Sequence, residues 1–189
     1  MNRWITASIL SLLAVPLAAQ QPAPVPVPGA PTSNAVRVFL AQFARNIVAA
    51  ADDMPVQQYK FRPTAPQMSV ADVVMHLAGS NEFLCSSASS TPAPQEPALG
   101  PVADSVPPDQ LKARLKRSFE YCQSALGKVD DSRLNDSVPW FGNRKVPRAQ
   151  VLVALPYDWA DHYSQMAIYL RLNGISPPNA QKRAEPVKR

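Results

Sequence analysis

The sequence of 189 residues predicts an all-α fold, a four-helix bundle. Two observations lead to this fold class. Four stretches repeat apolar residues every three or four positions, the spacing that gathers side chains on one face of a helix. No stretch alternates apolar and polar residues as a half-buried strand does, and no internal repeat is present. Helices that each carry one apolar face bury those faces by packing against one another.

Residues 1–20 have the pattern of a secretory signal peptide. Arg3 is their only charge, residues 5–17 are apolar, and Ala18 and Ala19 offer a cleavage point. The apolar run is too short to span a membrane, so we expect a periplasmic or secreted protein with no stable membrane insertion after cleavage. Residues 21–33, rich in proline and alanine, are expected to form a disordered leader.

The first helix is expected to open the folded domain, which we place at residues 34–178. Ser33 or Asn34 can cap its start, and Pro55 stops it near Met54, because proline has no amide hydrogen to donate. Its apolar face contains Val36, Phe39, Leu40, Phe43, Ile47 and Met54.

The second helix is predicted to begin at a capping box. In Ser69-Val70-Ala71-Asp72, the serine side chain can bind the amide of Asp72 while the aspartate binds back to Ser69. His76 lies at the edge of the apolar side of this helix. A long proline-, alanine- and serine-rich segment, residues 86–107, then leads to the third helix.

The third helix is expected to end at Gly127, with one apolar stripe that includes Leu111, Leu115, Phe119, Cys122 and Leu126. Residues 128–147 are expected to be irregular. They contain Trp140 and Phe141, which we expect to cover one end of the bundle rather than to bind a ligand.

The fourth helix is predicted from Pro147 or Arg148 to about Asn173, where Gly174 and the prolines after it end it. Pro156 lies inside it and predicts a kink. Its inward arc carries a polar row, Asp158, His162, Gln165 and Tyr169, among apolar residues. Because an unpaired buried carboxylate is costly, this row needs partners. Two interpretations stay open: an Asp–His pair that orients helices, and a metal or catalytic site.

These pieces together resemble the DinB-like superfamily, over about residues 34–178. The resemblance rests on ADDMP at 51–55, YKFRP at 59–63, HLAGSN at 76–81, DHYSQM at 161–166 and YLRLNG at 169–174. It implies an up-down-down-up topology, with a long crossover between the second and third helices. Many members bind a divalent metal through one histidine on the second helix and two, one turn apart, on the fourth.

Carried over by position, the ligands implied are His76 and His162, with Asp158 where the family has its third histidine. Two imidazoles and a carboxylate can hold Zn²⁺, Ni²⁺, Mn²⁺ or Fe²⁺ with positions left for water. A metal-free core, in which Asp158 pairs with a protonated histidine, is the alternative. Residues expected around the ligands are Asn81, Gln165 and Tyr169.

The function expected is therefore that of an exported, divalent-metal-dependent transferase or hydrolase acting on an unidentified small molecule. The alternative is a non-catalytic helical bundle of the cell envelope that binds a ligand or partner. The formal charge of +5 comes largely from residues 179–189, which we expect to be a disordered basic tail. No basic patch with interleaved aromatic residues indicates nucleic-acid binding. The sequence leaves a homodimer open.

A disulfide is expected between Cys85 and Cys122, the two cysteines of the chain, because an exported protein meets an oxidising compartment. In a simple antiparallel hairpin these residues would lie at opposite ends of their helices. A helix of about 17 residues spans about 26 Å, which about eight extended residues can retrace. Residues 86–107 are thus long enough to start the third helix parallel to the second. Two buried free thiols are the alternative.

Overall fold

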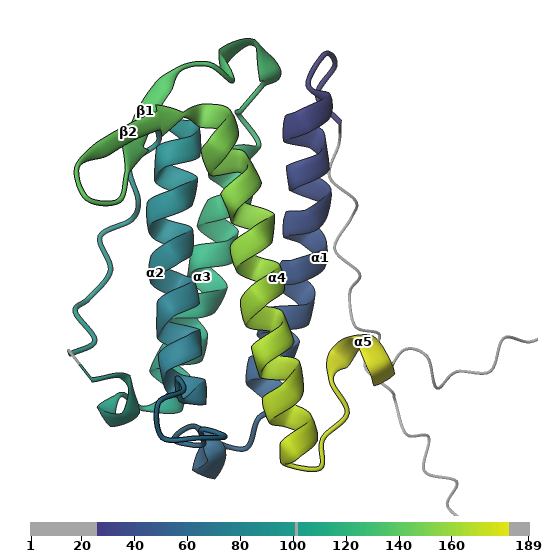
Figure 1. Cartoon of the computed structure of the whole chain (residues 1–189), viewed down its shortest axis with the longest axis vertical. Coiled ribbons are helices and arrows are strands. Elements are labelled where there is room, and N and C mark those ends of the chain that lie inside the picture. Colours follow the sequence, from purple (N-terminus) through teal and green to yellow (C-terminus); the bar gives the residue numbers. More distant parts are fainter. Residues whose placement is uncertain (1–25, 101, 182–189) are drawn as a thin grey trace, which may run out of the picture.

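The computed structural model describes residues 26–100 and 102–181, and there it contains a four-helix bundle (Figure 1). The signal peptide expected at residues 1–20 lies outside this part, as do residues 21–25 of the expected leader and residues 182–189 of the expected tail. The long helices are α1 (Pro31–Asp53), α2 (Val70–Ser89), α3 (Pro108–Leu126) and α4 (Arg148–Leu172). Short 3₁₀ turns occur at η1 (Val56–Gln58), η2 (Ala103–Ser105) and η3 (Asp131–Arg133).

The helices follow the up-down-down-up order. In Figure 1, α1 and α4 run in one direction, while α2 and α3 run in the other. Two consecutive parallel helices require a connection as long as the bundle, and residues 90–107 provide it. This crossover is attached at both ends: Tyr121 donates a hydrogen bond to the carbonyl of Thr91 at 2.6 Å, and Ser69 donates to the carboxylate of Asp104 at 2.5 Å.

Helix α1 starts earlier than the sequence indicated. Ala30 takes the cap position and Pro31 the first helical position, where its missing amide hydrogen costs nothing. The free amides of the first turn are bound from a distance by Asp131, which accepts hydrogen bonds from the amides of Thr32 and Ser33 at 2.7 and 2.9 Å. The leader expected over residues 21–33 was therefore wrong at its end, where Ala30 and Ser33 are buried.

Helices α2 and α3 carry the features predicted for them. Ser69 and Asp72 form the capping box at the start of α2. A disulfide joins Cys85 on α2 to Cys122 on α3, with 5.3 Å between their Cα atoms. Both cysteines are fully buried, so the bond lies inside the core at the seam of the two parallel helices.

Residues 137–147, expected to be irregular, form a small antiparallel hairpin of β1 (Ser137–Trp140) and β2 (Arg144–Pro147). Gly142 and Asn143 adopt positive φ values of 68° and 57°, which the tight turn between the strands requires. The hairpin lies over one end of the bundle beside α2 (Figure 1), where the ring of Phe141 packs 4.4 Å from that of Phe83.

The C-terminal end of α4 is closed as expected. Gly174 has a φ of 75°, and the amide of Ile175 binds back to the carbonyl of Leu170. A further short helix, α5 (Pro178–Gln181), then packs beside α1, where Gln181 donates to the carboxylate of Asp53 at 3.1 Å. The disordered tail expected from residue 179 was thus wrong over its first three residues. None of the described helices is long and apolar enough to cross a membrane.

Candidate metal centre

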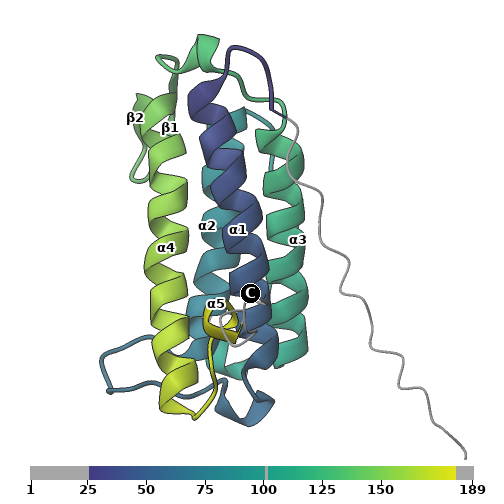
Figure 2. The same ribbon diagram turned by 90° about the vertical axis from the view of Figure 1, so that its right-hand side faces the viewer.

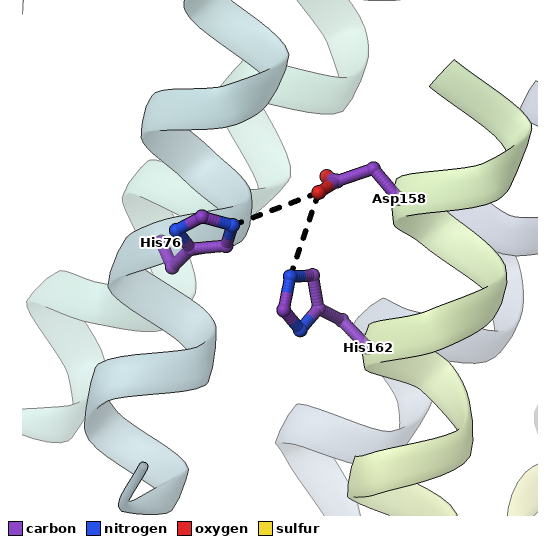
Figure 3. A group of neighbouring side chains, drawn as sticks. All are labelled: His76, Asp158 and His162. Carbon is purple, nitrogen blue, oxygen red and sulfur yellow. Dashed lines mark ion pairs between the residues drawn. The ribbon is translucent and has the colours of Figure 1, made fainter. Parts of the chain in front are cut away.

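Three side chains converge between two neighbouring helices. His76 lies in the second turn of α2, while Asp158 and His162 lie one turn apart on α4 (Figure 3). The Nε2 atoms of His76 and His162 lie 3.6 and 3.5 Å from the same oxygen, Oδ1 of Asp158. The imidazole ring centroids are 4.5 Å apart. One donor atom from each residue fits within 4.8 Å of the other two.

The group lies at the edge of the bundle rather than in its core, where the inward arc of the fourth helix was expected to place it. The side chain of His162 is 10% exposed and that of Asp158 is 19% exposed, but that of His76 is 44% exposed. Solvent therefore reaches the three residues from the side of His76, while α4 shields the other two.

The charges of the three residues support one another. Burial raises the pKa of Asp158, but the hydrogen bonds and charges of His162 and His76 outweigh it and bring the pKa to about 2. Burial also lowers the pKa of His162, and the hydrogen bond and charge of Asp158 outweigh it, so the net pKa lies above the ordinary value. The metal-free site is therefore an anionic carboxylate that favours the protonated form of His162.

The same geometry suits a divalent metal. Two ligand atoms at the usual 2.1 Å from a tetrahedral ion lie about 3.4 Å apart, close to the two nitrogen–oxygen distances of 3.5 and 3.6 Å. Oδ2 of Asp158 and Nδ1 of His162 are buried and have no hydrogen-bond partner among the described residues. A carboxylate with one unused buried oxygen is costly unless a cation compensates it. The donor set thus fits an ion such as Zn²⁺ or Fe²⁺.

Sequence reasoning did not assign a role to Ser80. Its Oγ lies 3.2 Å from Nε2 of His76, one helical turn earlier on α2. The hydroxyl of Ser80 and the carboxylate of Asp158 both face Nε2 of His76. A Ser–His–Asp relay uses both nitrogens of the imidazole, so these three residues do not form one. The helical spacing of four residues was the signal available for this contact.

The residues expected around the ligands mostly lie elsewhere. Asn81 accepts a hydrogen bond from the indole of Trp159 at 2.7 Å and donates to Ser118 at 3.0 Å, which joins α2, α3 and α4 inside the core. Tyr169 donates to the carbonyl of Met68 at 2.9 Å, away from the three residues.

Gln165 is the only one of the expected neighbours that acts on the site. It donates to the carboxylate of Asp161 at 3.1 Å. It also adds to the raised pKa of His162, although less than Asp158 and Asp161 do. Its side chain therefore influences one candidate ligand without contacting the carboxylate of Asp158.

Comparisons with known proteins agree with this architecture. The family model of the DinB superfamily matches residues 40–166. A DinB-like protein of Bacillus subtilis is similar in structure, with a TM-score of 0.56, 14% identity, and coverage of 73% of this chain and 93% of that one. A DinB-like protein of Bacillus cereus gives a TM-score of 0.57 and 16% identity over 75% and 94% of the two chains. These identities show a shared fold, and no curated protein matches. The extent of the family match leads to one conclusion: the chain belongs to the DinB superfamily.

Proposed function

We propose that this protein binds a divalent metal ion through His76, Asp158 and His162 and acts on a small molecule as a metal-dependent transferase or hydrolase. The observation that carries the proposal is the convergence of three suitable donor atoms within 4.8 Å. They come from two helices far apart in sequence, and two of the three residues keep buried polar atoms without partners.

An ion held by these residues would supply an acidified water or polarise a carbonyl or thiol. The chain's own groups determine the rest. Asp158 offers one negative charge to both imidazoles. His162 lies on α4 with its side chain largely buried from solvent. His76 is the exposed member, so a substrate would approach from its side. The hydroxyl of Ser80 can donate a hydrogen bond there.

Metal content is the direct test. The protein, purified without a histidine tag, is expected to contain close to one equivalent of Zn, Ni, Mn or Fe by elemental analysis. His162→Asn and Asp158→Asn should lose it. Asp109→Asn is the control, because Asp109 is an exposed carboxylate of α3 outside the group of three. Wild-type protein that neither retains nor takes up an ion after chelation would contradict the proposal.

The alternative function is a non-catalytic bundle that binds a ligand or partner. The observation that favours it is that the three residues form a stable ion pair without a metal. The pKa of Asp158 is lowered to about 2 and that of His162 is raised, so the negative carboxylate is paired with a protonated imidazole. Under this alternative, the Asp158 variants change stability but no metal content.

We also propose that the protein is exported. The disulfide between Cys85 and Cys122 supports this location, because such bonds persist in oxidising compartments. The signal-like pattern of residues 1–20 points the same way. N-terminal sequencing of protein recovered from the periplasm or medium would test it, and full-length protein confined to the cytoplasm would contradict it.

A further inference from the structure

A second hollow lies on the seam between α1 and α3, which run side by side in Figure 2. It is a cavity of about 530 Å³, within the range of small-molecule sites. Its apolar lining includes Leu40, Ala44 and Val48 of α1 and Phe119 of α3. Alanine at position 44 leaves room between the helices that a larger side chain would fill. None of the lining residues belongs to the candidate metal centre.

Arg37 lines one end of this cavity and is an unusual buried cation, with 6% of its surface exposed. One terminal nitrogen donates to the carbonyls of Leu126 and Val129 at 2.8 and 2.9 Å, and the other donates to Asn34 at 2.5 Å. All these partners are neutral, and Nε has no partner among the described residues. The guanidinium is therefore buried without a carboxylate in direct contact, which is costly. The charge of Asp131, which binds the start of α1, offsets only part of this cost, because burial still lowers the pKa of Arg37 below its ordinary value.

Two other arginines of the chain use the guanidinium edge formed by Nε and Nη2, at which Nε of Arg37 has no partner among the described residues. Nε and Nη2 of Arg114 bind the two oxygens of Glu82 at 2.9 and 2.7 Å, and Arg117 binds Glu96 in the same way. This two-pronged contact is the geometry in which guanidinium groups recognise carboxylates. At Arg37, Nε is the donor that an incoming carboxylate would satisfy.

The other charged residues that line the cavity balance one another, so its net charge is that of Arg37. Arg45 and Lys116 are exposed cations on its two walls, and Glu120 lies on the α3 wall. Asp52 lies fifteen residues beyond Arg37 on α1, about 22 Å along the helix axis. The lining residues thus include three cations and two carboxylates, which leaves a net charge of +1, and Arg37 is the buried member among the cations.

We propose that this cavity binds an anionic amphiphile, a molecule with one carboxylate and a single hydrocarbon chain. The carboxylate would lie at Arg37, and the chain would lie along Leu40, Ala44, Val48 and Phe119. The site is independent of the proposed metal function, because it uses the opposite pair of helices.

Isothermal titration with three probes of equal chain length tests the sign of the charge. Dodecanoate and dodecyltrimethylammonium are each titrated below the concentration at which they form micelles, and dodecanol is titrated below its solubility limit. The expected result is one dodecanoate per chain, bound at least tenfold more tightly than the other two. Equal affinities for the three probes would overturn the proposal, since a nonselective apolar surface gives that result. Metal-loaded and metal-free protein should bind dodecanoate equally.

Two variants locate the binding. Ala44→Phe fills the cavity and should weaken dodecanoate at least tenfold, whereas Ala113→Phe, at an exposed alanine of α3 outside the cavity, should not. Arg37→Met should reduce the preference for dodecanoate over dodecanol to less than threefold. If Arg37→Met fails to fold, the probe comparison and Ala44→Phe decide. Unchanged dodecanoate binding by Ala44→Phe would overturn the proposal. So would a wild-type dimer that Ala44→Phe converts to a monomer, because the cavity would then be covered by a second copy of the chain.

Discussion

The disulfide between Cys85 and Cys122 allows a sharp stability prediction, because substitution of either cysteine alone removes the bond. The bond closes a loop with a sequence separation of 37. Constraint of the unfolded chain by a loop of this length contributes about 4 kcal/mol to the free energy of unfolding. In a protein of this size, that loss should lower the melting temperature by about 8–16 °C.

The assay is urea unfolding, followed by far-ultraviolet circular dichroism without reductant, of Cys85→Ala, Cys122→Ala and the double variant. Each single variant should lose nearly the full 4 kcal/mol, because one substitution already opens the loop. The double variant should lose only about 1 kcal/mol more, for the second small buried side chain. The effects should therefore be strongly non-additive.

Thiol titration provides the control. Denatured, unreduced wild-type protein should show no free thiol, and each single variant should show one. Small and additive losses of stability, together with two free thiols in the wild type, would refute both the cross-link and the reasoning from loop length.

Three further predictions concern the charged groups. First, the ion pair of metal-free protein should stabilise it most between about pH 4 and 6.5, the unfolded pKa values of aspartate and histidine. The contribution of Asp158, whose folded pKa is lowered to about 2, is lost as the pH falls toward that value; that of His162, whose folded pKa is raised, is lost as the pH rises through it. Asp158→Asn should therefore destabilise more at pH 6 than at pH 9 in urea titrations, and an equal effect would contradict the pairing. Second, metal uptake measured by titration should weaken as the pH falls from 8 to 5.5, because protons compete for His162; pH-independent uptake would exclude this ligand. Third, Asp131→Ala should lower the free energy of unfolding by about 1 kcal/mol, because it removes the cap of α1. Asp130→Ala should lower it less in the same assay, because the side chain of Asp130 binds only Ser132 in its own turn.

The sequence predicted the helices well where their ends carry local chemistry. The capping box at Ser69 and Asp72 and the stop at Gly174 depend on residues within one turn, and both appear in the structure. The start of α1 was misplaced because Pro31 follows several other prolines and was assigned to the leader. Its cap, Asp131, lies about a hundred residues away and is invisible to a local pattern.

The hairpin was missed for a related reason. Its strands have four residues each, contain Pro139 and Pro147, and expose most of their side chains, so they show no alternation of apolar and polar residues. Gly142 and Asn143, adjacent in the chain, were the available turn signal.

For the candidate site, helical periodicity indicates which way a side chain points from its own helix but not what the neighbouring helix places opposite it. His76, Asp158 and His162 were brought together through the family resemblance, and the structure shows their convergence. Asn81 was expected beside the ligands, yet it accepts a hydrogen bond from Trp159 in the core instead. That outcome depends on the rotation of α4 relative to α2, which only packing decides.

The position of the disulfide relative to the crossover has one more consequence. Cys85 precedes residues 90–107 and Cys122 follows them, so the bond spans the longest irregular connection of the bundle. A protease that cuts this connection would produce two polypeptides that still travel as one molecule. They would separate on an electrophoresis gel only after reduction. The helices on either side of the cut, each tied to the other through the core, would remain a single folded unit built from two chains.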